Sequence, residues 1–324
     1  MKRREWMQKS GAAALGVIAA PHARHFFWPE AKLDCAFQLS VITDEITQDF
    51  GHALDVAAKE FGVGFVELRG LWNKNIVNLD EKEVAEVKRL LAKYDLKVTD
   101  IASPLFKVDW PGAPKSKYSP TGDAYKASFT FEQQDEVLER AAAMAKAFGT
   151  NKVRLFDFWR LEDDKPYRKA MDEKLREISE KAAKKEIVLV LENEFECNTA
   201  TGSESARTLA AVKNKNFFLN WDPGNAAKLG DKAFPEGYAL LPKDRIGHMH
   251  LKDVKKKADG SFDWECMGRG IIDYVEQFKA MMRDGYHGTM SLETHWKGAG
   301  TTEESSRQSM AGTKELLRKA GALK

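Results

Sequence analysis

The sequence has few cysteines and almost no net charge. Its three cysteines, Cys35, Cys197 and Cys266, are too few and too scattered for a disulfide framework, and no CxxC pair indicates a zinc site. The 51 basic and 49 acidic residues leave a formal net charge of +2, which argues against a dedicated nucleic-acid-binding protein. A hydrophobic content of 43% with 31% charged residues indicates a globular protein with a sizeable core and excludes disorder.

Long hydrophobic runs and a dinucleotide-binding glycine pattern are also missing. The apolar stretch at residues 11–20 is about half of the ~20 residues needed to span a bilayer, so we expect no stable membrane insertion. No predicted strand is followed by GxGxxG. The glycines of residues 267–270 precede a helical pattern and lack the third glycine, which argues against a Rossmann fold.

The N-terminus has the layout of a secretory signal, with a basic start, a short apolar stretch and small residues. The pair Arg3-Arg4, followed by Trp6 and Met7, resembles a bacterial twin-arginine signal. We therefore expect residues 1–33 to be a signal and leader, and the protein to be periplasmic or otherwise exported. A basic, amphipathic N-terminal helix is the alternative.

Short β-rich runs alternate with longer helical runs from about residue 36 to the end. The predicted strands are residues 36–42, 64–68, 96–102, 152–158, 187–191, 217–221, 245–251 and 288–292. The predicted helices are residues 50–61, 80–94, 131–148, 167–185, 203–213, 234–241, 271–283 and 303–319, with a long loop at 103–128. Because strand–helix alternation requires parallel strands, eight units favour a closed barrel. We expect an α/β fold in which residues 34–324 form a single (β/α)8 TIM barrel.

Four successive predicted strands end in residue types that bind metal ions. These residues are Glu192, Asp222, His250 and Glu293. In a barrel, residues at the carboxyl ends of the strands form the active site. Three carboxylates and an imidazole would repel one another there unless a cation sat between them, and the set suits one divalent ion, Mn²⁺, Mg²⁺ or Zn²⁺. Any one of them alone could be a helix cap or a surface residue, so the prediction depends on their joint occurrence.

Four further residues are predicted to bind the substrate. Lys252 shares the inward parity of His250, and Glu67 and Arg154 have the inward parity of their own strands. Arg269 lies in a glycine-rich segment that is predicted to be flexible. The alternatives are a structural salt bridge for Lys252, a buried polar network for Glu67 and Arg154, and a plain surface position for Arg269. The lysines at 255–257 are predicted to be a solvated loop.

Eight short motifs carry a resemblance to a known family. They are TDEI at 43–46, VELR at 66–69, LEN at 191–193, WDPGN at 221–225, HMHLKD at 248–253, GRGIIDY at 268–274, GYHG at 285–288 and SLE at 291–293. Over roughly residues 36–320 the chain resembles the sugar phosphate isomerase/epimerase group of the xylose isomerase-like barrel superfamily.

The resemblance implies roles for particular residues. It implies a divalent metal held by Glu192, Asp222, His250 and Glu293, with sugar hydroxyls completing the coordination. It also implies that Glu192 and Glu293 are the catalytic acid/base pair. Asn225 stands where ketose epimerases typically carry a substrate-binding histidine, so we expect Asn225 to contact the substrate and the substrate itself to differ.

These observations predict a divalent-metal-dependent sugar isomerase or epimerase that transfers protons between carboxylates and a metal-stabilised enediolate. Two alternatives stay open. One is a lyase or dehydratase that acts on a keto-sugar or oxidised glycoside through the same enolate. The other is a non-catalytic periplasmic sugar-binding protein. The expected partner is a small carbohydrate and not a nucleic acid, and a homo-oligomer is possible.

Overall fold

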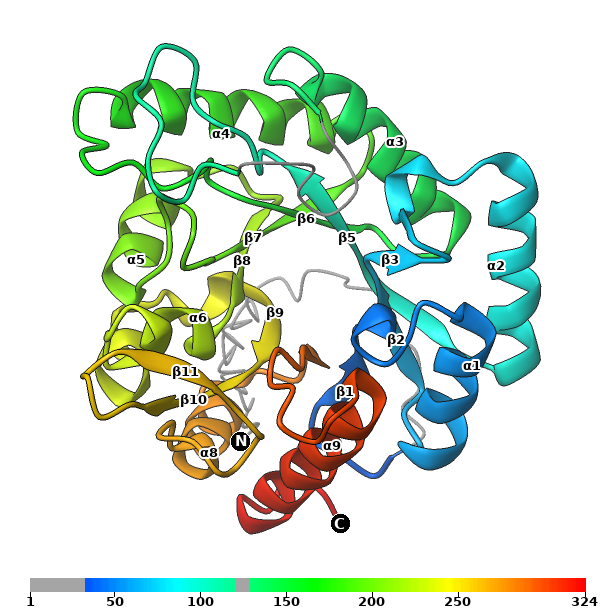
Figure 1. The fold of residues 1–324 in the computed structure, drawn as a ribbon. Helices are drawn as coiled ribbons and strands as arrows, with labels where there is room; N and C mark the ends of the chain where they lie inside the picture. The colour runs from blue at the N-terminus through cyan, green and yellow to red at the C-terminus, as the bar shows by residue number, and fades with distance from the viewer. Residues whose placement is uncertain (1–32, 121–128) are drawn as a thin grey trace, which may run out of the picture.

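The computed structural model describes residues 33–120 and 129–324 (Figure 1). The predicted export signal spans residues 1–33, of which 1–32 lie outside the described residues. The long loop predicted at 103–128 is likewise described only in part. The fold and the candidate site therefore rest on the body of the chain.

Eight parallel strands form one sheet that curves into a nearly closed barrel (Figure 1). The sheet order is β1-β12-β9-β8-β7-β6-β5-β2, and a single parallel bridge from Ile42 to Glu67 joins its two edges. The strands are β1 (Gln38–Val41), β2 (Phe65–Leu68), β5 (Lys97–Leu105), β6 (Lys152–Leu155), β7 (Val188–Glu192), β8 (Phe217–Trp221), β9 (Ile246–Leu251) and β12 (Thr289–Leu292). The predicted barrel of eight strands is confirmed, and its carboxyl ends share one mouth.

Helices surround the strands (Figure 1), and apolar residues of the helices belong to the buried core. They are α1 (Phe50–Asp55), α2 (Glu81–Tyr94), α3 (Gln134–Ala147), α4 (Arg168–Ala183), α5 (Gly202–Ala211), α6 (Pro223–Lys228), α7 (Tyr238–Leu240), α8 (Tyr274–Arg283) and α9 (Thr302–Lys319). In α2, Asp80 and Glu83 form a reciprocal capping box, and Val87, Leu90 and Leu91 are buried. The predicted helix therefore begins where its acidic first turn indicated.

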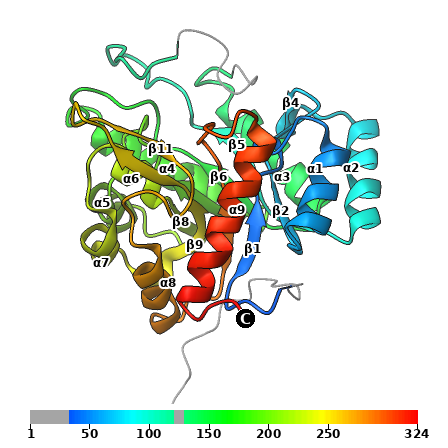
Figure 2. The ribbon, with the colours of Figure 1, turned by 60° about the horizontal axis from the view of Figure 1, so that its bottom comes forward.

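The two ends of the described barrel meet. Cys35, just before β1, forms an antiparallel bridge with Leu323, and the backbone N–H of Ala36 donates to the carbonyl of Ala322 at 2.7 Å. Figure 2 shows the C-terminus beside the start of β1. The last segment of the chain therefore ties the final helix to the first strand.

The barrel interior contains a layer of buried charged side chains. His248 of β9 reaches across to β2 and β5, with its Nε2 atom 3.1 Å from Glu67 Oε2 and 3.6 Å from Asp100 Oδ1. Lys152 of β6 is also buried and donates to the carbonyl of Gly247 at 3.1 Å. Because buried polar groups are costly unless they are paired, this layer constrains how the strands can pack.

Two short hairpins were not predicted. One joins β3 (Gly70–Leu71) to β4 (Lys74–Asn75), and the other joins β10 (Asp253–Lys256) to β11 (Phe262–Glu265). The predicted loop at 255–257 is therefore partly wrong, since two of its lysines belong to β10. They stay exposed, and Lys255 pairs with Glu265 at 3.0 Å, so the ammonium groups are solvated as expected while the backbone is paired.

Several element boundaries also differ from the prediction. The strand predicted at 152–158 ends at Leu155, and Phe158 takes a left-handed φ of 54°, which a strand cannot contain. The helix predicted at 234–241 becomes a wide turn, Ala233–Gly237, and a single helical turn, Tyr238–Leu240. Among the described residues, every helix is too short or too polar to cross a bilayer.

Candidate metal centre

Four predicted residues meet at the mouth of the barrel. Glu192 is the last residue of β7, Asp222 directly follows β8, His250 lies in β9 and Glu293 directly follows β12. One ligand atom from each lies within 4.8 Å of the others, and none of the four residues is more than 3% exposed. β7, β8, β9 and β12 are consecutive in the sheet, so their carboxyl ends bring these side chains together.

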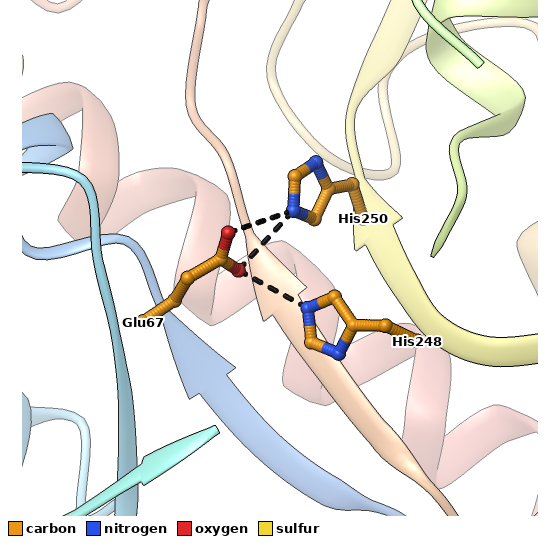
Figure 3. A group of neighbouring side chains, drawn as sticks. All are labelled: Glu67, His248 and His250. Carbon is orange, nitrogen blue, oxygen red and sulfur yellow. Dashed lines mark hydrogen bonds and ion pairs between the residues drawn. The ribbon is translucent and has the colours of Figure 1, made fainter. Parts of the chain in front are cut away.

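His250 presents one ring nitrogen to this cluster. Its Nδ1 atom lies 3.0 Å from Glu293 Oε2, 3.2 Å from Glu192 Oε1 and 3.7 Å from Asp222 Oδ2. Its Nε2 atom points the other way, to Glu67 of β2 (Figure 3). The His250 ring therefore lies between the three carboxylates of the cluster and the buried carboxylate of Glu67.

An arginine holds one oxygen of each glutamate. Arg154 Nη1 lies 2.9 Å from Glu192 Oε2, and Arg69 Nη1 lies 2.5 Å from Glu293 Oε1. The second oxygen of each carboxylate faces His250 Nδ1. The arginines thus orient both carboxylates and leave one oxygen of each directed at the cluster.

Arg69 was not predicted as a site residue, although it belongs to the VELR motif. Its guanidinium also contacts Glu45 Oε1 at 2.5 Å and Asp44 Oδ2 at 3.0 Å, both from the TDEI motif. Arg69 shares the parity of Glu67 on the same strand, so the alternation of side chains could have singled it out.

Lys252 places its ammonium group among the carboxylates. Its Nζ atom lies 2.5 Å from Glu293 Oε2, 2.8 Å from Asp222 Oδ2 and 3.5 Å from Glu192 Oε1. Lys252 follows His250 by two residues, so both side chains emerge on the same face of the strand. The lysine predicted to bind substrate therefore also neutralises the predicted ligands.

Asn225 is held beside Glu192 by the start of α6. Asp222 caps this helix by accepting the Asn225 backbone N–H at 2.9 Å, and Pro223 occupies the first helical position. The Asn225 side-chain amide donates to Glu192 Oε1 at 3.1 Å. The WDPGN motif therefore positions one candidate ligand and a neighbouring polar group through the same helical turn.

Burial and charge act against each other on the four groups. Burial raises the pKa of Glu192 and of Glu293, but the surrounding cationic groups outweigh it and leave both pKa values below their usual range. Burial raises the pKa of Asp222 to about 6, with Lys252 and His250 opposing part of the increase. Burial lowers the pKa of His250, but the neighbouring carboxylates raise it well above its ordinary value. Both glutamates are thus ionised at neutral pH.

Glu67 lies behind the cluster. Its side chain is fully buried, and both carboxylate oxygens face the imidazoles of His248 and His250 (Figure 3). A contact between Glu67 and a substrate was predicted from its inward parity. The observed contacts instead fit the alternative role given for Glu67, a buried polar network.

Arg269 is not brought into the cluster. Its side chain is exposed, and its guanidinium lies 5.7 Å from the centre of the Trp296 ring. The backbone N–H groups of Gly268 and Gly270 donate to Asp253 Oδ2 at 3.1 and 3.0 Å. The segment that was expected to be flexible is therefore fixed to the start of β10, because the buried Asp253 carboxylate accepts its amides.

An aromatic residue at the mouth was not predicted. Trp264 of β11 packs edge-on against His295 with ring centres 4.9 Å apart, and Lys252 Nζ lies 5.5 Å from its ring centre. Trp264, His295 and Glu293 line the same small hollow. Trp264 lies in a hairpin after the seventh barrel strand, beyond the strand ends from which the site residues were predicted. A larger hollow lies elsewhere, around Lys152 and the amino-terminal ends of β2 and β5.

The residues at the centre fit a divalent cation. Three carboxylates and one imidazole, without thiolate, match the preferences of Mg²⁺, Mn²⁺ and Zn²⁺. Asp222 Oδ2 and Glu293 Oε2 are buried and make no hydrogen bond within the described chain, although both face the Lys252 ammonium. Both oxygens face the centre of the cluster, where a metal ion would compete with that ammonium for them.

Comparison with known proteins gives a family and a fold. Residues 56–317 match the model of the xylose isomerase-like TIM barrel family. The putative L-ribulose-5-phosphate 3-epimerase SgbU of Escherichia coli K12 is 26% identical over 167 residues, which cover 50% of this chain and 58% of that protein. The match therefore spans little more than half of this curated relative.

Solved structures share the fold at low sequence identity. A xylose isomerase-like TIM barrel protein from Mycobacterium smegmatis, in complex with magnesium, has a TM-score of 0.60 at 18% identity, covering 85% of this chain and 89% of that one. The probable 3-DHS dehydratase AsbF from Bacillus anthracis has a TM-score of 0.64 at 22% identity, covering 86% and 98%.

Proposed function

This chain belongs to the xylose isomerase-like TIM barrel family, and from that premise we propose that it is a divalent-metal-dependent sugar isomerase or epimerase. The observation that carries the proposal is the meeting of Glu192, Asp222, His250 and Glu293 within 4.8 Å at the barrel mouth. The similarity to a putative pentulose-phosphate epimerase supports the isomerase class.

Glu192, Asp222, His250 and Glu293 would hold the metal ion. The magnesium complex of a protein with the same fold supports a divalent ion. When bound, such an ion supplies Lewis acidity that polarises the carbonyl of a chelated sugar, an effect worth several kcal/mol.

Glu192 and Glu293 are the proposed proton-transferring pair. Both are ionised because neighbouring cations lower their pKa values. Arg154 and Arg69 fix one oxygen of each and leave the other directed at the cluster. One carboxylate can remove the proton next to the sugar carbonyl and becomes a carboxylic acid, which can return that proton to the enediolate at the same or the next carbon. For delivery to the opposite face, the other glutamate must first take up a proton from solvent. Each such positioned group typically contributes ~10²–10⁴-fold to the rate.

A lyase or dehydratase is the second candidate, favoured by the shared fold with a probable 3-DHS dehydratase. It would use the same carboxylates to form the same enolate and would then expel a β-leaving group. Solvent deuterium separates the two reactions. Incorporation at the carbon next to the carbonyl without net elimination supports the isomerase, whereas an unsaturated product supports the lyase. Sugar binding with no exchange, even with metal restored, would indicate a binding protein.

Elemental analysis of purified wild-type protein and a Glu293→Gln variant tests the metal site. We expect about one divalent ion per wild-type chain and loss of most of it in the variant, because an amide oxygen replaces a charged ligand. Glu194→Gln is the matched control, since Glu194 is equally buried but faces Lys107 at 2.9 Å. Full metal retention in Glu293→Gln would contradict the assignment.

Export, oligomeric state and sugar class are further parts of the proposal. An exported enzyme would meet free, oxidised or glycosidic sugars, because sugar phosphates are cytosolic. Fractionation of cells that express the full chain and an Arg3→Lys/Arg4→Lys variant tests export: the wild type should be exported and the variant retained. Light scattering of the purified protein would identify a homo-oligomer.

A further inference from the structure

The Glu67 carboxylate is shared by two imidazoles beneath the cluster (Figure 3). His250 Nε2 lies 3.1 Å from both Glu67 oxygens, and His248 Nε2 lies 3.1 Å from Oε2. All three side chains are completely buried. An ionised carboxylate in such a place is costly unless donors face it, and here two ring nitrogens do.

We propose that Glu67 is a positioning residue that keeps the proton of His250 on Nε2, so that the Nδ1 lone pair faces Glu192, Asp222 and Glu293. This role rests on the proposed function, because it assigns His250 as a metal ligand through Nδ1. A histidine that binds a metal ion is neutral and keeps one N–H, so an acceptor at Nε2 leaves Nδ1 as the ligating nitrogen. Carboxylates that hold a ligating histidine in this way raise its basicity and fix its ring orientation.

Donors in the barrel interior reach Glu67 through His248. Lys152 donates to Thr289 Oγ1 at 3.2 Å. The Thr289 hydroxyl can then turn its own hydrogen toward His248 Nδ1, at 2.5 Å, which leaves the His248 proton on Nε2, where Glu67 Oε2 and Ser291 Oγ both lie at 3.1 Å. An ionised Glu67 has only acceptors, so each imidazole nitrogen that bonds to it donates.

Asn220 of β8 fits this assignment in one of its two amide orientations. The atom placed as its amide nitrogen lies 3.0 Å from His250 Nε2, where two donors would face each other, while its Oδ1 atom makes no hydrogen bond among the described residues. The two ends of an amide occupy the same volume, so exchanging them turns the oxygen toward the Nε2–H as a second acceptor. Nδ1 faces the candidate ligands Glu192 and Glu293, at 3.2 and 3.0 Å.

A glutamine at position 67 would break this arrangement. It offers one acceptor and one amide donor in place of two acceptors. With both His248 and His250 protonated on Nε2, an amide oxygen in the Oε2 position would be shared by the two N–H groups, and the NH₂ in the Oε1 position would lie 3.1 Å from the His250 Nε2–H. His250 can avoid this contact between two donors by moving its proton to Nδ1. That change of tautomer removes the lone pair that would bind the metal.

The test is metal titration of EDTA-stripped protein by calorimetry, with Zn²⁺ as the probe. We expect Glu67→Gln to weaken Zn²⁺ binding by about 10–100-fold. Glu67→Asp keeps the charge and should recover part of the affinity. Asp100→Asn is the matched control, because Asp100 is equally buried in the same layer but contacts His248, at 3.6 Å, and not His250. Its Zn²⁺ affinity should stay within about twofold of wild type.

Nitrogen NMR of ¹⁵N-histidine-labelled, Zn²⁺-bound protein gives a readout that a merely structural role would not move. His250 in the wild type should show a protonated Nε2 and a Zn²⁺-bound Nδ1. Wild-type His250 bound through Nε2 would overturn the proposal without any variant, even if Glu67→Gln failed to fold. Glu67→Gln that binds Zn²⁺ as tightly as wild type would overturn the Glu67 role alone. Wild-type protein that binds no divalent metal would instead overturn the proposed function.

Discussion

At the scale of single residues, the charge balance of the mouth depends on Lys252. Three carboxylates are gathered there with almost no exposure, and the Lys252 ammonium lies within 3.5 Å of all three. Burial lowers the pKa of Lys252, but the carboxylates raise it well above its usual value, so the group is charged. A bound divalent ion would repel this ammonium, which makes Lys252 a competitor for the same oxygens as well as a candidate substrate contact.

Lys252→Met should therefore change two properties in opposite directions. The affinity for Mn²⁺ should rise by about tenfold or more, because repulsion between nearby charges in a protein is worth a few kcal/mol at an effective dielectric of about 20. The free energy of unfolding in EDTA should fall by about 3–5 kcal/mol, the usual cost of removing one partner of a buried ion pair. Calorimetry and urea denaturation measure the two effects, and weaker Mn²⁺ binding by the variant would refute the competition.

At the scale of elements, the contact between α6 and β9 sets the spacing of the cluster. α6 carries the cap Asp222 and the amide of Asn225, while β9 carries His250 and is followed directly by Lys252. Gly224, in the first turn of α6, has no room for a side chain, since a Cβ there would lie 2.6 Å from Lys252 Cβ and 2.7 Å from its carbonyl oxygen. The glycine of the WDPGN motif thus permits a close approach between two site-bearing elements.

Gly224→Ala should move α6 away from β9. We expect a loss of about 1–3 kcal/mol in the free energy of unfolding, as in other overpacked sites, together with weaker metal binding. Gly51→Ala in α1 is the control, because its Cβ would meet atoms only at 3.6 and 3.9 Å. That change should be neutral or stabilise the helix by up to ~1 kcal/mol. Thermal melts and metal titration measure the stability and the metal affinity of both variants. Equal effects of the two substitutions would show that the close approach of α6 to Lys252 is unimportant.

At the scale of the whole molecule, the barrel interior supports the mouth from below. The chain of contacts from Lys152 through His248 to Glu67 links β6, β12, β9 and β2 across the barrel. It ends at the edge where Ile42 and Glu67 form the one bridge that closes the sheet. The charged layer that orients the site therefore also ties the β2 edge of the sheet to β9 and β12.

Lys152 gives this layer a measurable pH dependence. Burial lowers its pKa to about 8, with Asp100 and Glu67 opposing part of the decrease. Between pH 8 and 10 the unfolded chain binds the proton that the folded chain has lost, so the wild type gains stability as pH rises, by up to about 3 kcal/mol. This contribution is lost as pH falls through 8.

Denaturant unfolding of wild type and Lys152→Met across this range measures the effect. The difference in unfolding free energy should shift in favour of wild type as pH rises. Lys184→Met, at an exposed position, should differ from wild type by a constant amount. A constant difference for Lys152→Met as well would show that its ammonium is not destabilised by burial.

The local pattern of the sequence was enough to predict much of this protein. Hydrophobic periodicity and capping residues are local signals, so the order of eight strand–helix units and most of their boundaries followed from them. The four residues of the cluster were also predicted from the sequence, because a parallel barrel brings the carboxyl end of every strand to one mouth. The family was recognised from short motifs at those same ends.

Other features depend on which residues meet across the barrel, and only the tertiary structure decided them. Parity placed Glu67 and Lys252 on inward faces, but it could not distinguish a contact with substrate from a contact with His250 or with three carboxylates. Glu67 and His250 are 183 positions apart, and Arg69 and Glu293 are 224 apart. No local periodicity encodes such pairings, because they arise from the closure and tilt of the whole sheet.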